Sequence, residues 1–108
     1  MDAAFNGSFD LAELQRTIRR SEGLGFALTG FASRDEKMHV GDADFPSNLL
    51  HYELVPAPPA AIECVSFVNA SGAATELAKR QSSGWDLVAF GTLYVKSKAT
   101  LLAAFRHS

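Results

Sequence analysis

Residues 25–31 read Gly-Phe-Ala-Leu-Thr-Gly-Phe, and residues 84–90, which lie 59 positions later, read Gly-Trp-Asp-Leu-Val-Ala-Phe. A helix-like stretch precedes each segment, and in these stretches Ile18 aligns with Leu77. Each stretch runs into a glycine, an aromatic residue and an apolar strand, and a second strand follows a short polar turn. The sequence therefore predicts a weak internal duplication of a helix-strand-strand unit.

The first unit is predicted to begin with a helix at Asp10. Asp10 and Glu13 have the spacing of a capping box, in which the two side chains satisfy free backbone amides of the first helical turn. After the helix we expect a strand over residues 26–32, a polar turn over residues 33–37 and a short strand over residues 38–40. Apolar side chains recur at helical spacing and predict a face that packs on a core: Leu11, Leu14 and Ile18.

Residues 41–48 predict the clearest loop of the chain, because aspartates, a glycine and a proline all favour turns. We expect this loop to join the two halves, which cover about residues 9–40 and 62–106 of a single domain, residues 1–108. A further interruption is expected where prolines cluster, because proline donates no hydrogen bond to a strand ladder. These prolines are Pro56, Pro58 and Pro59.

The second unit is predicted to start with a strand over residues 62–68. Either Asn69 or Ser71 has a side chain suited to cap the helix that follows, and Gly84 is expected to end that helix. The remaining residues predict a hairpin with a tight polar turn. Its strands are expected over residues 85–95 and 99–106.

This order of elements predicts an α+β fold. The expected arrangement is one antiparallel sheet with both helices on one face, of the ferredoxin-like kind. Alternation along residues 85–95 then makes both faces of the sheet apolar. Trp85, Leu87, Ala89, Leu93 and Val95 are predicted to point one way, and Val88, Phe90 and Tyr94 the other.

Two short helices cover only one face of such a sheet, so another body is expected on the second face. Long loops, a ligand or a second subunit would each serve. We favour a second subunit, because closed two-fold assemblies are the commonest among soluble oligomers. The candidate sheet-face interface of this homodimer consists of Val88, Phe90 and Tyr94.

The second half resembles a small bacterial family of unknown function, which is recognised by a helix followed by Gly-Trp-Glu-Leu-Val and by a closing strand that ends in Phe-Lys or Phe-Arg. Here the corresponding residues are Gly84-Trp85-Asp86-Leu87-Val88 and the closing Phe105-Arg106. The resemblance covers roughly the last 50 residues of the chain. It implies a fold and carries no activity.

Composition excludes several classes of function. With 12 acidic residues, 10 Lys and Arg and a formal charge of −2, the chain lacks the basic excess of nucleic-acid-binding domains. No run of about 18 apolar residues predicts a membrane span, and the start does not read as a signal peptide. We therefore expect a cytoplasmic protein that binds neither nucleic acid nor membrane. The single cysteine, Cys64, lies in an apolar run and is predicted to be a buried thiol.

No motif in the sequence predicts a catalytic or metal site. Six residues would have to supply any metal ligands, and none of the histidines among them has the short spacing that presents two imidazoles to one ion. No Gly-x-Ser-x-Gly segment surrounds a serine. We expect no metal ion and no other cofactor. The six residues are His39, His51, His107, Asp42, Asp44 and Glu53.

Two functions stay open at this stage. The first is a non-enzymatic ligand- or protein-binding module that assembles as a homodimer through its sheet face. The alternative is a small enzyme whose active site lies in a cavity between sheet faces or subunits. In the enzyme, Tyr94, Arg106 or His107 would serve as acid, base or anion clamp at the strand ends.

Overall fold

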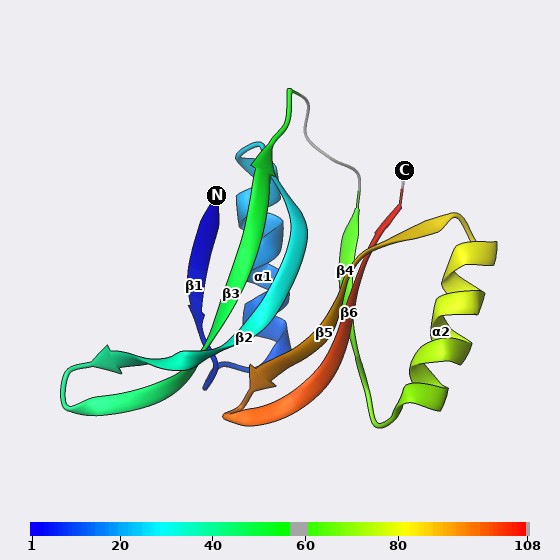
Figure 1. Cartoon of the computed structure of the whole chain (residues 1–108). Coiled ribbons are helices and arrows are strands. Elements are labelled where there is room, and N and C mark those ends of the chain that lie inside the picture. Colours follow the sequence, from blue (N-terminus) through cyan, green and yellow to red (C-terminus); the bar gives the residue numbers. More distant parts are fainter. Residues whose placement is uncertain (57–60, 108) are drawn as a thin grey trace.

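The computed structural model describes residues 1–56 and 61–107. Within these residues it contains two helices and two three-stranded antiparallel sheets, so the predicted α+β class is confirmed (Figure 1). In chain order the elements are β1 (Asp2–Asn6), α1 (Leu11–Gly23), β2 (Phe26–Val40), β3 (Ala43–Leu54), β4 (Ile62–Phe67), α2 (Ala70–Ser82), β5 (Trp85–Val95) and β6 (Lys98–His107).

The single sheet expected from the sequence is wrong. The first sheet has the strand order β1-β3-β2 and the second the order β4-β6-β5. In each half the last strand takes the central place, because it pairs with its hairpin partner on one side and with the strand before the helix on the other. Each half therefore completes its own sheet. A ferredoxin-like arrangement is not confirmed, since that motif runs β-α-β-β-α-β.

The two helices do not share one face, which also corrects the expected layering. Helix α1 contacts both β2 and β4, and the two sheets meet where β2 contacts β5, so α1 lies between them. Helix α2 stands on the side of the second sheet away from the first (Figure 1). Its Arg80 lies over the Phe105 ring, whereas the preceding residue of β6, Ala104, belongs to the core that includes Ile18 of α1. Neighbouring residues of a strand point to opposite faces, so α1 and α2 lie on opposite faces of the second sheet.

The main core lies between the two sheets and around α1. Its most deeply buried members are fully closed to solvent, and they come from both halves of the chain. Burial of such side chains from water is the principal stabilising contribution to a fold of this size. The members with 0 % or 1 % exposure are Leu14, Ile18, Leu28, Leu50, Leu93, Leu102 and Ala104.

Both helices begin where a side chain caps them. The Asp10 carboxylate accepts a hydrogen bond from the Glu13 amide at 2.9 Å, and the Asn69 side chain accepts one from the Gly72 amide at 2.9 Å. The predicted start at Asp10 is confirmed, and of the two alternatives for α2 the cap is Asn69. Gly25 and Gly84 follow the helices with φ angles of +93° and +85°, a conformation that L side chains rarely adopt.

The predicted turn at residues 33–37 and the predicted loop at residues 41–48 are wrong, because β2 and β3 form one long hairpin. The pairing slips between Arg34 and Met38, and this irregularity accommodates the polar residues. Pro46 lies opposite the slip and just beyond the last pair that β3 makes with β1, so its missing N–H costs the ladder no hydrogen bond. In the proline cluster, β3 ends before Pro56, and Pro58 and Pro59 lie outside the described residues.

Two side-chain amides bond backbone groups at the two edges of the second sheet. Gln15 of α1 donates to the Ile62 carbonyl at 2.7 Å and accepts from the Cys64 amide at 2.6 Å, both on β4. Asn48 of β3, which is fully buried, donates to the Tyr94 carbonyl at 2.9 Å and accepts from the Tyr94 amide at 2.8 Å on β5. Each amide thus takes the place of a neighbouring strand and joins the two halves.

Candidate functional site

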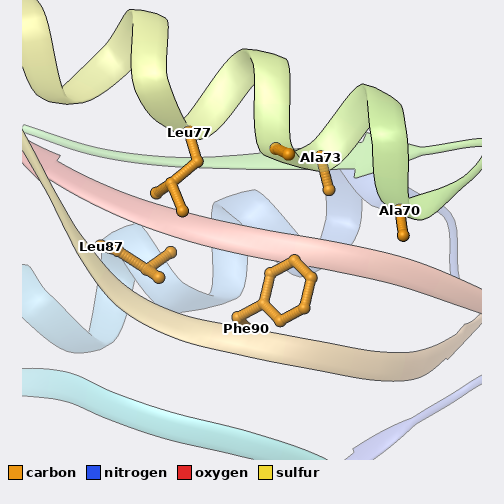
Figure 2. A pocket seen from close by; sticks show the side chains of 6 residues that line it. Ala70, Ala73, Leu77, Leu87 and Phe90 are labelled. Atoms are coloured by element: carbon orange, nitrogen blue, oxygen red, sulfur yellow. The ribbon is translucent and has the colours of Figure 1, made fainter.

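An apolar pocket of about 260 Å³ lies between α2 and β5. Figure 2 shows Leu87 and Phe90 of β5 pointing toward the side chains of α2. All six of the described residues that line it are apolar, so none of their side chains offers a hydrogen bond to an occupant. The lining of this pocket, called the α2–β5 pocket below, consists of Ala70, Ala73, Ala74, Leu77, Leu87 and Phe90.

The pocket exists because α2 presents small side chains to a strand that presents large ones. Ala73 is the buried residue of α2. The methyl side chains of Ala70 and Ala74 are too small to fill the space above β5. Leu87 is therefore 37 % exposed and Phe90 is 50 % exposed, although a helix stands over both. Leu87 and Phe90 thus form an apolar surface that α2 covers incompletely.

The three residues of the predicted interface do not lie together. The pairing of β5 with β6 shifts between Leu87 and Ala89, and this bulge changes which face the following residues point to. Phe90 lines the α2–β5 pocket, but Val88 packs against the main core. The strict alternation expected for β5 is thus wrong at the bulge. That alternation predicts Leu87 and Phe90 on opposite faces, whereas in the structure both line the α2–β5 pocket. No residue type at this position signals a bulge.

Tyr94, the third residue of the predicted interface, lies near the other end of β5. Its backbone amide and carbonyl are both bonded by the Asn48 side chain. A Cβ added to Gly7 would lie only 2.5 Å from the Cβ of Tyr94, so the two residues are in close contact. Tyr94 therefore belongs to the junction between the two halves of the chain, away from the α2–β5 pocket.

One end of α2 is fixed to the second sheet by Arg80. The Arg80 guanidinium donates to Glu63 of β4 at 2.7 Å and to Glu76 at 2.8 Å, and it lies 5.0 Å from the centre of the Trp85 ring. The hydrogen bonds that Arg80 donates to Glu63 and then to Glu76 raise the pKa of Arg80, and the bond from Arg80 lowers the pKa of Glu63. These contacts hold the C-terminal half of α2, while the pocket lies under its first two turns.

A partly buried ion pair connects α1 with β6. Glu22, only 4 % exposed, accepts from the Leu28 amide at 2.8 Å and pairs with Arg106, which also donates to the Leu28 carbonyl at 3.2 Å. Among the described residues, the buried side-chain nitrogen and oxygen atoms left without a hydrogen-bond partner include Glu22 Oε1 and Arg106 Nε. Burial raises the pKa of Tyr52 and raises that of the Cys64 thiol to about 12. Cys64 is thus a neutral thiol at physiological pH.

The residues proposed for an enzyme are spread over the molecule. Trp85 pairs with His107 and Tyr94 pairs with Ala99, so eight residues of β6 separate Tyr94 from His107. That separation is about 27 Å at roughly 3.4 Å per residue. Arg106 is bound to Glu22, and the His107 ring packs edge-on against Trp85 at 5.0 Å. The structure therefore does not bring Tyr94 together with the other two side chains.

The six residues considered as metal ligands do not form one cluster. His39 pairs with Asp44, and His51 pairs with Asp2, a partner that the sequence did not indicate. The hydrogen bond with His51 lowers the pKa of Asp2. In residues 1–56 and 61–107 there is no group of three or more His, Cys, Asp or Glu side chains placed to hold a metal ion.

The chain matches no protein-family model, no curated protein and no solved structure. In the part of the chain that the structure describes, neither helix is long and apolar enough to cross a membrane.

Proposed function

We propose that the protein is a non-enzymatic binding module and that it binds through the α2–β5 pocket. The observation that carries this proposal is the partly open space of about 260 Å³ above Leu87 and Phe90, where every lining residue that the structure describes is apolar. The wide separation of Tyr94 from Arg106 and His107 supports a binding role over a catalytic one. A cytoplasmic location and assembly as a homodimer are parts of the same proposal.

The proposal includes an internal duplication, in which both halves derive from one strand-helix-strand-strand unit. In its support, α1 and α2 each have 13 residues and begin 59 positions apart. The positive-φ glycines that follow the two helices, Gly25 and Gly84, are also 59 positions apart. The pairing of β2 shifts directly after Leu28, and that of β5 directly after Leu87, again at the same offset. The resemblance of the second half to the bacterial Gly-Trp-Glu-Leu-Val family belongs to this part of the proposal.

The binding role is tested with a pair of exposed apolar residues, Phe90 in the pocket and Leu54 at the end of β3. Leu54 is 75 % exposed and does not line the pocket, so Leu54→Asp is the matched control for Phe90→Asp. Native mass spectrometry on protein purified gently from cells measures any bound mass. We expect additional mass, from a second copy or from a bound molecule, on the wild type and on Leu54→Asp.

Phe90→Asp should keep the circular dichroism spectrum of the wild type and lose the additional mass, because a carboxylate in an apolar site loses its hydration without gaining a partner. A wild-type protein that carries nothing and has the mass of one chain would show that the α2–β5 pocket is not a binding site. Additional mass that survives in Phe90→Asp would show that binding occurs elsewhere on the molecule.

A further inference from the structure

We infer that the α2–β5 pocket takes a small uncharged apolar molecule with about the volume of two leucine side chains. This inference rests on the proposed function, because it names the occupant of the same site. It is carried by a comparison of α2 with α1.

The two helices differ at the positions that face their own sheets. Leu11 and Leu14 of α1 lie 59 positions before Ala70 and Ala73 of α2. In the first half Leu14 is 1 % exposed and Leu11 packs against the main core. In the second half the two alanines line an open pocket. The first half thus shows which chemistry fills this place, namely branched aliphatic side chains.

The size of the pocket agrees with the two missing leucines. An engineered apolar cavity of about 150 Å³, made by replacing one buried leucine with alanine, stays dry and binds benzene. Two such replacements would leave about 300 Å³, and the α2–β5 pocket has about 260 Å³. A site of this size suits one or two aromatic rings or a short acyl chain.

The lining excludes charged occupants. Gln15 of α1 bonds the edge of β4 with its side-chain amide. The corresponding residue of α2, 59 positions later, is Ala74, whose side chain has no polar atom. A charged or strongly polar group in the pocket would lose hydration without a hydrogen bond in return. Arg80, the side chain by which α2 bonds to β4, is already bonded to two carboxylates.

The extent of the site favours a small ligand over a second copy of the chain. A stable interface takes about 20–30 residues from each partner. The α2–β5 pocket has six lining residues, of which Leu87 and Phe90 are the exposed large apolar ones. Six residues are the right number to surround a small molecule and too few to hold a protein by themselves.

The test is a titration of ¹⁵N-labelled protein with toluene and with naphthalene, followed by amide chemical shifts. Ala70→Leu and the double variant Ala70→Leu/Ala73→Leu restore the side chains of α1 and fill the pocket. Ala78→Leu is the matched control, because it makes the same substitution at an exposed position of α2 outside the lining. Ala70 is itself exposed, so Ala70→Leu is expected to fold even if the double variant does not.

We expect saturable shifts confined to α2 and β5 in the wild type and in Ala78→Leu, with affinity at least tenfold weaker in the filled variants. Wild-type amides that do not respond to either probe would overturn the inference, as would binding that is unchanged in the filled variants. The two proposals can fail separately. If neither probe binds, but native mass spectrometry shows a second copy on the wild type that Phe90→Asp loses, the small ligand is wrong and the proposed function stands. If neither probe nor partner binds, both are wrong.

Discussion

Among the glycines of the described residues, Gly7 has the least room for a side chain. Its backbone amide donates to the Pro46 carbonyl at 2.7 Å, and its own carbonyl accepts from the Ser97 amide at 2.8 Å. A Cβ on this residue would lie 2.5 Å from Tyr94 Cβ and 2.8 Å from Pro46 O. Three segments from different parts of the chain therefore meet at a point with no room for a methyl group.

Gly7→Ala is expected to lower the free energy of unfolding by about 1–3 kcal/mol, because the added methyl meets backbone and Cβ atoms that cannot rotate away. Urea denaturation at neutral pH measures the change. Gly23→Ala is the matched control, since a Cβ there has nothing within 4 Å. At the end of α1 it should be neutral or stabilise by up to about 1 kcal/mol. Equal effects of the two substitutions would contradict the close packing at Gly7.

At the scale of elements, α2 depends on a small number of contacts at one end. Arg80 connects it to Glu63 of β4 and to the rings of Trp85 and Phe105, whereas its first turns stand over the α2–β5 pocket. Helices in proteins owe most of their stability to tertiary packing. We therefore expect α2 to open more readily than α1, whose Leu14 and Ile18 are fully buried.

Arg80→Met keeps an unbranched stem over the two rings and removes the hydrogen bonds to Glu63 and Glu76. We expect it to destabilise the protein by about 1–2 kcal/mol and to speed hydrogen exchange in α2 relative to α1. Lys79→Met, at an exposed neighbouring position, should change neither quantity. Uniform acceleration of exchange across both helices would contradict a local anchor.

The same anchor has a pH dependence with a definite sign. Arg80 lowers the pKa of Glu63 below its ordinary value of 4.5, so the stabilisation that this pair gives is complete above pH 4.5. It is lost as the pH falls through the lowered pKa, where Glu63 becomes protonated in the folded protein. The difference in unfolding free energy between wild type and Arg80→Met should therefore shrink on acidification below pH 4.5. A difference that grows in acid would be inconsistent with this ion pair.

The elements that could be predicted from the sequence are those fixed by local chemistry. The cap at Asp10, the glycine that follows each helix and the turn after Val95 all rest on residues close together in the chain. The long β2–β3 hairpin could not be predicted, because Pro46 is tolerated there only through the slip in the opposite strand. The bulge after Leu87 has no signal in the sequence, and it decides which side chains line the pocket.

At the scale of the whole molecule, polar contacts between the halves supplement the apolar core. Gln15 bonds α1 to β4, Asn48 bonds β3 to β5, and Glu22 pairs with Arg106 of β6. The separation into two sheets could not be predicted from the sequence, because these contacts join residues at least 46 positions apart. Apolar pattern alone indicates which residues are buried, but it does not determine how two similar halves are placed.

Asn48→Ala should therefore destabilise the whole molecule. It leaves the amide and the carbonyl of Tyr94 without their partner at a buried site, at a cost of about 2–4 kcal/mol. Thermal unfolding followed at far-ultraviolet wavelengths measures this loss. Asn6→Ala, which removes only a local bond to the Ser8 amide, should cost less than about 1.5 kcal/mol. A larger loss in Asn6→Ala would show that Asn48 does not join the halves.

The bonds made by Gln15 and Asn48 also bear on aggregation. An exposed strand edge invites another chain to add a strand, and many proteins block such edges with charges or prolines. Here Gln15 occupies backbone groups of β4 at one edge of the second sheet, and Asn48 occupies those of β5 at the other. Strand addition at these points would first have to displace a side-chain amide, so self-association of the second sheet is directed away from its edges and toward its faces.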